Sequence, residues 1–211
     1  MADLKKLYNA VLNGDLKTAV ASTKDALAEG ADPLDMISGY MVPAMSEVGR
    51  RYECEEYFVP ELLLAARAMK GSLELIRPLL SARGVEPAGR VVIGTVKGDL
   101  HDIGKNLVAS LLEGGGFEVV DLGSDVAPEK FAQAVKDRNA NIVCLSALLT
   151  VTMPAMKATM EALKNAGVRD RIKVMIGGAP VTQQYADEIG ADGYGENASV
   201  AVTLARRLVG I

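Results

Sequence analysis

Residues 91–106, VVIGTVKGDLHDIGKN, join a short run rich in β-branched residues to a glycine-containing loop and to the start of a helical pattern. Valine and isoleucine in such a run favour a buried strand, and glycine and aspartate favour the turn that follows it. The same order of a short strand and a helix recurs up to the C terminus. Alternation of this kind is typical of an open parallel sheet with helices on both faces.

Five strands are expected after residue 90, and a helix is expected after each of them. The strands are predicted at 91–96, 117–123, 141–147, 172–178 and near 192–195. The helices are predicted at 103–113, 127–138, 153–166, 181–189 and 198–209. We therefore predict an α/β domain with a five-stranded, doubly wound parallel sheet of the Rossmann or flavodoxin-like type. Such a sheet binds ligands at the carboxyl ends of its strands, where the strand order reverses.

The first 85 residues show helical spacing and little sign of strands. Helices are predicted over 4–12, from Asp15 to about 28, from Asp32 onward with a kink or break at Pro43, and over about 59–80. An apolar seam follows one face of the last helix, formed by Phe58, Leu62, Ala65, Met69, Leu73, Ile76 and Leu80. We predict a helical bundle domain over 1–85 and a sheet domain over 86–211, with a linker in SARGVEPAGR, residues 81–90.

Composition narrows the classes of partner and of site. The net charge is -4 and neither half of the chain is basic, so nucleic acid is not expected as a partner. No apolar run approaches the roughly 18 residues of a membrane span, the start lacks the core of a signal peptide, and cysteines are few, so we expect a cytoplasmic protein without a membrane partner. With a single histidine, a histidine-rich zinc site is excluded.

The loop after the first predicted strand holds that histidine, His101. A lone histidine is more often packed or solvated than a ligand, but this one lies at the edge where a parallel sheet binds ligands. Asp99, two residues away, could bond one ring nitrogen and make the other more basic toward a metal. Gly98 and Gly104 lack side chains and would let a large flat group approach the backbone.

Three commoner loop types do not match this stretch. A P-loop has four residues between its glycines, whereas five separate Gly98 from Gly104. The Gly-x-Gly-x-x-Gly fingerprint of dinucleotide-binding sheets is absent after the strand. A phosphorylation receiver would need an aspartate at the end of the third strand, which ends instead in LSA, residues 145–147.

The other loops at the same predicted edge are small and uncharged. They are SALLTVT at 146–152, GGAP at 177–180 and GYGENAS at 193–199. Each could be an ordinary turn. Together, their glycines and hydroxyls favour a narrow slot that suits a long ligand with a polar tail.

GDLHDIG, residues 98–104, resembles the Asp-x-His-x-x-Gly signature of cobalamin-binding domains. LSALLT and IGGAP are similar to the second and third motifs of that family. Residues 48–70, VGRRYECEEYFVPELLLAARAMK, resemble the helical cap of methionine synthase and of the small corrinoid proteins of anaerobic methyltransferase systems. The resemblance extends from about residue 4 to residue 209.

This resemblance implies roles for individual residues. The corrinoid would bind with its lower base detached, and His101 would be the lower axial ligand of cobalt. Asp99 would hold the other ring nitrogen, and Thr152 would extend the pair, where methionine synthase has a serine. Further cofactor contacts would come from Gly98, Leu100, Asp102, Ile103 and Gly104 at the corrin, from Ser146, Leu148, Thr150, Gly177, Gly178, Tyr194, Gly195 and Ala198 along the tail, and from Phe58 and Leu62 in the cap.

The implied function is that of a methyl carrier. The protein would take a methyl group onto cobalt from a substrate-specific methyltransferase and deliver it to a corrinoid:tetrahydrofolate, tetrahydropterin or thiol methyltransferase. A reductive activator would return cobalt(II) to the cobalt(I) state. At 211 residues the chain has no room for a catalytic barrel beside the two domains, so we expect no turnover by the chain alone.

Rival functions remain open at the level of sequence. A cobalamin-dependent sensor would share both domains, although such caps typically carry a tryptophan and this chain has none. A subunit of an adenosylcobalamin isomerase and a scaffold without cofactor are further alternatives. The methyl donor (methanol, methylamines, betaine or aryl methyl ethers), the final acceptor, the lower base and the oligomeric state are not determined by the sequence.

Overall fold

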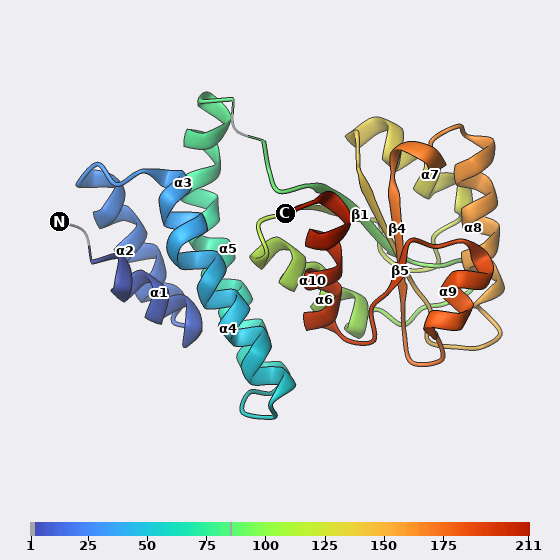
Figure 1. Cartoon of the computed structure of the whole chain (residues 1–211), viewed down its shortest axis with the longest axis horizontal. Helices are drawn as coiled ribbons and strands as arrows, with labels where there is room; N and C mark the ends of the chain where they lie inside the picture. Colours follow the sequence, from blue (N-terminus) through green and yellow to red (C-terminus); the bar gives the residue numbers. More distant parts are fainter. Residues whose placement is uncertain (1–2, 85) are drawn as a thin grey trace. The chain divides into compact units, whose positions relative to one another are not determined.

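The computed structural model describes residues 3–84 and 86–211 of the chain. Its contacts divide the chain into a helical unit and an α/β unit (Figure 1). The helical unit comprises the residues up to 87 together with 113–116, and the α/β unit comprises 88–112 and 117–211. The division in the linker thus falls between 87 and 88, near the position expected between 85 and 86.

The helical unit is built from amphipathic helices, as the spacing of apolar residues predicts. They are α1 (Leu4–Leu12), α2 (Leu16–Ala28), α3 (Pro33–Met36), α4 (Val42–Glu53) and α5 (Val59–Ala82). Asp15 and Asp32 cap α2 and α3 by accepting backbone N–H groups of the first turn, as aspartate does at this position. Most of the predicted seam of α5 is buried, but Phe58, at its start, is 64% exposed.

The break predicted at Pro43 takes the form of a wider helical turn. A π-helical turn, Ile37–Met41, precedes α4, and Pro43 lies in the first turn of α4. Proline has no N–H to donate to the preceding turn, and the amide of Val42 reaches back to the carbonyl of Ile37. The chain therefore continues in a helical direction through this point.

The α/β unit contains the predicted five-stranded, all-parallel sheet. Its strands are β1 (Arg90–Thr95), β2 (Glu118–Asp121), β3 (Ile142–Ser146), β4 (Lys173–Gly177) and β5 (Gly193–Tyr194), in the order β2-β1-β3-β4-β5. The helices between and after them are α6 (Ile103–Gly114), α7 (Pro128–Arg138), α8 (Pro154–Asn165), α9 (Gln183–Ile189) and α10 (Ala198–Val209). A short 3₁₀ helix at Arg169–Arg171 was not expected from the sequence.

Helices cover both faces of the sheet, as Figure 1 shows. Val91 and Ile93 of β1 point to the side of α6 and α10, whereas Val92 packs with side chains of α7, α8 and α9. Alternate residues of one strand therefore bury against opposite helical layers, which explains why the strands are almost continuously apolar.

The strand order places one crevice at the carboxyl end of the sheet. β1 lies between β2 and β3, and the register pairs Thr95 with Ser146 at the ends of β1 and β3. The chain leaves β1 toward α6 on one face and leaves β3 toward α8 on the other. The two loops diverge at the point where the strand order reverses, and doubly wound sheets bind ligands there.

Candidate functional site

His101 and Asp99 lie in the loop between β1 and α6, residues 97–102, which we call the His101 loop. Oδ1 of Asp99 lies 2.8 Å from Nδ1 of His101 and accepts the backbone N–H of His101 at 3.0 Å. Asp99 is fully buried, whereas the side chain of His101 is half exposed. Nε2 of His101 has no partner within the described part of the chain, so it can meet a ligand.

The loop between β3 and α8 completes the surroundings of Asp99. Oδ2 of Asp99 accepts the N–H groups of Leu148 at 2.7 Å and of Leu149 at 3.3 Å. It also lies 2.7 Å from the hydroxyl of Thr152, which is placed 2.8 Å from the carbonyl of Leu149 as well. The structure therefore joins His101, Asp99 and Thr152 in one chain of hydrogen bonds.

These donors decide the charge of Asp99. Burial by itself raises the pKa of a carboxyl group, but the hydrogen bonds from Thr152, His101 and Leu148 outweigh it and hold the pKa of Asp99 well below its usual range. An ionised carboxylate only accepts hydrogen bonds, so Nδ1 of His101 must carry a proton. In the neutral ring, Nε2 then has a free lone pair, which is the form that binds a metal.

Exposed apolar side chains lie in the two loops that carry His101 and Thr152 and at the first residue of α6. Leu100, Ile103 and Val151 are 74%, 84% and 80% exposed, and Leu148 and Leu149 are 43% and 42% exposed. Large apolar groups exposed together mark a binding surface more often than ordinary solvent-facing surface. One metal-binding nitrogen among apolar side chains fits a flat, largely apolar macrocycle that carries a metal.

Sequence reasoning had not singled out Leu149 and Val151. They lie in the same loop as the expected Leu148 and Thr150, but the resemblance draws attention only to alternate residues. The signal available in the sequence was that two further large apolar residues lie in a loop expected at the surface. The structure shows that this loop offers an apolar surface as well as hydroxyl groups.

The glycines expected along the tail of the cofactor lie at the ends of neighbouring strands. Gly177 pairs with Ser146, and Tyr194 pairs with Ile176. Gly178 has φ +128°, and a Cβ there would lie only 1.9 Å from the carbonyl oxygen of Ala147. Glycine is therefore required for the loops after β3 and β4 to approach each other. The passage of a cofactor tail along these residues stays a prediction.

The remaining predicted residues divide into exposed and buried groups. Asp102 and Thr150 are exposed in the loops that carry the site, and Gly104 is exposed in the first turn of α6. Ala198 is buried in the first turn of α10, which Asn197 caps. In the helical unit Phe58 is exposed but Leu62 is fully buried, so Leu62 presents no surface to a ligand in this structure. The contacts of these residues with a cofactor stay predictions.

Two positioning residues were missed by sequence reasoning. The hydroxyl of Thr95, at the end of β1, donates to the carbonyl of His101 at 2.9 Å. Asp125, in the loop between β2 and α7, accepts the N–H of Gly98 at 2.8 Å. Both hold the His101 loop from outside it, and no spacing in the sequence connects either residue with the histidine.

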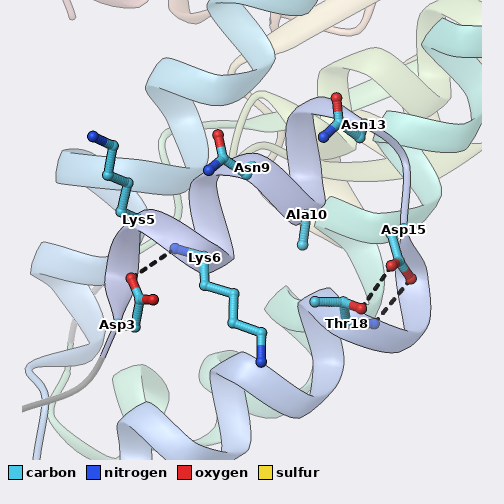
Figure 2. Close-up of a pocket in the computed structure, with 8 residues that line it drawn as sticks. All are labelled: Asp3, Lys5, Lys6, Asn9, Ala10, Asn13, Asp15 and Thr18. Carbon is cyan, nitrogen blue, oxygen red and sulfur yellow. Dashed lines mark hydrogen bonds between the residues drawn. The ribbon is translucent and has the colours of Figure 1, made fainter.

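Two hollows of the surface lie at other places. Figure 2 shows one of about 410 Å³ in the helical unit, lined by Asp3, Lys5, Lys6, Asn9, Ala10, Asn13, Asp15 and Thr18. Its carboxylates serve as helix caps, since Asp3 accepts the N–H of Lys6 and Asp15 accepts the N–H and hydroxyl of Thr18. The other, of about 530 Å³, lies between α7 and α8. Neither includes His101.

The residues described at this edge can therefore hold a metal-bearing macrocycle through one imidazole. No group of three or more histidine, cysteine, aspartate or glutamate side chains in the described residues could hold a free metal ion. A single protein ligand suits a metal whose other positions are filled by a cofactor. Within the described residues, no helix combines the length and the hydropathy needed to cross a membrane.

Comparison with protein families shows two matches along the chain. Residues 89–203 match a B12 binding domain, and residues 3–77 match a second kind of B12 binding domain. The first match contains the whole sheet and the His101 loop, and the second contains most of the helical unit.

Individual relatives match over almost the whole chain. Trimethylamine corrinoid protein 2 of Methanosarcina mazei is 45% identical over 201 residues, which cover 94% of this chain and 92% of the relative. Dimethylamine corrinoid protein 1 of Methanosarcina acetivorans is 42% identical, with coverages of 98% and 97%.

Solved structures give a similar result. A cobalamin-binding protein from Desulfitobacterium hafniense has a TM-score of 0.81 at 32% identity, over 99% of each chain. A chain of the methanol:cobalamin methyltransferase complex MtaBC from Methanosarcina barkeri has a TM-score of 0.85 at 32% identity, over 98% of this chain and 79% of that one.

Proposed function

This chain belongs to the B12-binding family of corrinoid proteins, and from that premise we propose that it carries a methyl group on the cobalt of a bound corrinoid between two methyltransferases. When bound, the corrinoid supplies the nucleophilic, methyl-bearing cobalt, while the protein supplies placement and electrostatics. The observation that carries the proposal is the hydrogen-bonded chain of Thr152, Asp99 and His101, which leaves Nε2 of His101 without a partner among the described residues, in loops that also expose apolar side chains.

The proposed binding mode places Nε2 of His101 on the lower face of cobalt, with the lower base of the corrinoid detached. Asp99 keeps the proton on Nδ1 and thereby directs Nε2 toward the metal. Leu100, Ile103 and Val151 are exposed in or next to the loops that carry His101 and Thr152, and they would cover the apolar edge of the ring system. The detached tail would run past Gly177 and Gly178, where the loop backbones lie close together.

The same residues can couple a proton to the state of the metal. When Nε2 of His101 is not a ligand, it can take up a proton, and the ionised Asp99 stabilises the imidazolium that results. The hydroxyl of Thr152 and the N–H of Leu148 donate to Asp99 and help to hold its pKa below the usual range, so the carboxylate would be available to stabilise that charge. Proton uptake therefore favours release of the axial ligand, and proton loss favours its binding.

The proposed partners follow from this role. One methyltransferase would load the methyl group, and a second would pass it to a tetrahydrofolate, tetrahydropterin or thiol acceptor. A reductive activator would reduce cobalt(II) to cobalt(I). The relatives named for trimethylamine and dimethylamine are 42–45% identical, whereas the chain of the methanol complex is 32% identical. We therefore propose a methylated amine as the donor.

The test uses the single histidine of the chain. The full-length protein is reconstituted with hydroxocobalamin, desalted and reduced to cobalt(II), and its electron paramagnetic resonance spectrum is compared with that of His101→Ala. Each cobalt line of the wild type should be split into three by an axial ¹⁴N. Protein labelled with ¹⁵N only at histidine should show two lines in place of three, since ¹⁵N has spin one half.

Each outcome bears on one part of the proposal. Retention of one corrinoid per chain with the isotope effect supports ligation by His101. If each cobalt line stays split into three in the protein labelled with ¹⁵N at histidine, the axial nitrogen belongs to the lower base of the corrinoid, and the proposed binding mode is overturned. A wild-type protein that retains no corrinoid overturns the proposed function itself.

A further inference from the structure

Asp125 holds the His101 loop from the side opposite to Thr152. Oδ1 of Asp125 accepts the N–H of Gly98 at 2.8 Å, and the N–H of Asp125 donates to the carbonyl of Asp99 at 2.9 Å. These two hydrogen bonds enclose the peptide that joins Gly98 to Asp99. Asp125 therefore binds the backbone of Asp99, the residue that carries the buried carboxylate, and of the preceding Gly98.

The backbone at both partners is unusual. Gly98 has φ +84° and Asp125 has φ +52°. Positive φ values are uncommon for residues other than glycine, although aspartate and asparagine are enriched among them. A Cβ on Gly98 would meet only Cγ2 of Thr152, at 3.8 Å, so the conformation, and not lack of space, calls for glycine there. Gly98 adopts this conformation without strain, whereas Asp125 needs local support for its positive φ, and its hydrogen bonds to Gly98 and Asp99 supply that support.

The segment that carries Asp125 is itself anchored to β1. Val126 forms an isolated parallel bridge with Val96, and the N–H of Thr95 donates to the carbonyl of Gly123 at 2.9 Å. The loop after β2 thus continues beside the end of β1 before α7 begins. It presents Asp125 to Gly98 from a backbone that the sheet holds.

The ion pair between Asp125 and the exposed Lys97 contributes less to holding the loop than the hydrogen bond to Gly98 does. Nζ of Lys97 lies 3.1 Å from Oδ1 of Asp125, and the two side chains are 59% and 42% exposed. Pairs so exposed contribute little to stability. The hydrogen bond from Gly98 and then the charge-assisted bond from Lys97 hold the pKa of Asp125 below its usual range. The carboxylate therefore stays an acceptor at neutral pH.

We propose that Asp125 is a positioning residue for the axial ligand: it holds the Gly98–Asp99 peptide, so that Asp99 presents His101 to the metal at a set position. The inference rests on the proposed function, because it assumes that His101 binds cobalt. The His101 loop is then held from two sides, by residues that follow β2 and by residues that follow β3. Thr152 and Leu148 of the β3 side hold the carboxylate of Asp99, and Asp125 of the β2 side holds its backbone.

Two substitutions separate the acceptor from the backbone conformation. Asp125→Asn keeps an oxygen acceptor and tolerates positive φ. Asp125→Gly also tolerates positive φ but removes the acceptor. Asn139→Gly is the matched control, because Asn139 has φ +48° at the end of α7 and forms no hydrogen bond with the His101 loop within the described part of the chain. Lys97→Gln removes the exposed ion pair and leaves the bond to Gly98.

The first measurement needs no cofactor. Hydrogen exchange of the Gly98 amide, followed by NMR in the unreconstituted protein, should become about tenfold faster in Asp125→Gly and stay near the wild-type rate in the other three variants. Unchanged exchange in Asp125→Gly would overturn the anchor. Equal acceleration in Asp125→Asn would overturn the assignment of the effect to the oxygen acceptor.

The second measurement tests the effect on the metal. In cobalt(II) protein, the histidine nitrogen splitting should be weakened or lost in a fraction of Asp125→Gly molecules and retained in Asp125→Asn. Full splitting in Asp125→Gly, despite faster exchange at Gly98, would overturn the positioning role. If wild-type protein binds no corrinoid, the proposed function fails, while the exchange at Gly98 still decides whether Asp125 anchors the loop.

Discussion

The hydroxyl of Thr152 lies 2.7 Å from Oδ2 of Asp99, although 53 positions separate the two residues in the chain. Both residues are buried, and the other carboxylate oxygen of Asp99 contacts the imidazole of His101. The parallel sheet produces this meeting, because the carboxyl ends of β1 and β3 lie side by side. The most polar part of the site is therefore assembled from two loops that neighbouring strands present to each other.

Replacing the hydroxyl of Thr152 should weaken the fold and leave its shape intact. Thr152→Val keeps the two branches at Cβ but removes a hydrogen bond to a buried charged group, at a cost of about 1.5–3 kcal/mol. Thr152→Ser keeps the hydroxyl and should cost less. The free energy of unfolding is measured in urea by circular dichroism, since the chain has no tryptophan to follow by fluorescence. Equal losses in the two variants would contradict this account.

Stability should depend on pH through Asp99 in a predictable direction. Its pKa in the folded protein lies below the ordinary value of 3.8, so its contribution is complete above that value and is lost as the pH falls toward the folded pKa. Wild-type protein should therefore lose stability below about pH 4 more steeply than Asp99→Asn, whose amide does not titrate in this range. Urea unfolding between neutral and acidic pH measures both slopes.

The comparison isolates one carboxylate among several. Glu47, whose pKa the hydrogen bonds from Arg50 and Arg51 lower to about 2, is present in both proteins. Only the difference between the two pH profiles belongs to Asp99. Parallel profiles would show that Asp99 is not held ionised by its surroundings.

A methyl group at Gly178 should disrupt the loops at the carboxyl end of the sheet. In Gly178→Ala the new Cβ would lie 1.9 Å from the carbonyl oxygen of Ala147, so the backbone has to move. We expect a loss of roughly 3 kcal/mol or more in the free energy of unfolding, together with weaker retention of corrinoid.

Gly190→Ala is the matched control for this substitution. Gly190 also has a positive φ, +74°, but a Cβ there meets nothing within 4 Å. Its cost should be limited to the backbone conformation, about 1–2 kcal/mol. If the two variants lose the same stability by circular dichroism, close approach of the loops does not explain why residue 178 is glycine.

The buried pair of Lys105 and Asp121 should respond asymmetrically to substitution. The side chain of Lys105 is 1% exposed and that of Asp121 is 38% exposed, with Nζ bonded to Oδ2. Asp121→Asn leaves a buried ammonium without its counter-charge and should cost about 3 kcal/mol. Lys105→Met removes the buried charge and leaves a carboxylate that water can reach, so we expect a change within about 1 kcal/mol.

The choice of asparagine at residue 121 keeps a second contact in place. Oδ1 of Asp121 also accepts the N–H of Gly123 at 2.9 Å, and an amide oxygen can replace it there. The difference between the two variants, measured by urea unfolding, therefore reports the buried charge. A larger loss in Lys105→Met than in Asp121→Asn would mean that the pair stabilises the fold by itself.

Elements of the fold were predictable because their signals are local. The runs at 91–96 and 141–147 became β1 and β3 within one or two residues at each end, since β-branched residues and flanking glycines act over a few positions. An interruption of the α-helix near Pro43 was predictable, but its form as a π-helical turn at Ile37–Met41 was not. That form depends on how the helix packs, which the sequence pattern does not describe.

The same distinction holds for the site: contacts within one loop could be predicted from the sequence, and contacts between distant segments could not. The pairing of Asp99 with His101 could be predicted because the two residues are close in one loop, and Thr152 was reached only through a family resemblance. Asp125 was missed because its bond to Gly98 spans 27 positions and leaves no periodic pattern. Leu62 was expected to face the cofactor, yet it is buried while Phe58, one turn away at the start of α5, is exposed, because apolar spacing does not show which neighbouring elements cover each residue.

By itself, the sequence determined the alternation of strands and helices, the single histidine and its nearby aspartate, because these follow from composition and from spacings of a few residues. Only the tertiary structure decided which loops meet that histidine. Parallel strands bring their carboxyl ends to one edge, and there Thr152, Leu148 and Asp125 contact a loop that is distant from them in the chain. Such hydrogen bonds depend on tenths of an ångström, and spacing along a sequence carries no distance between separate loops.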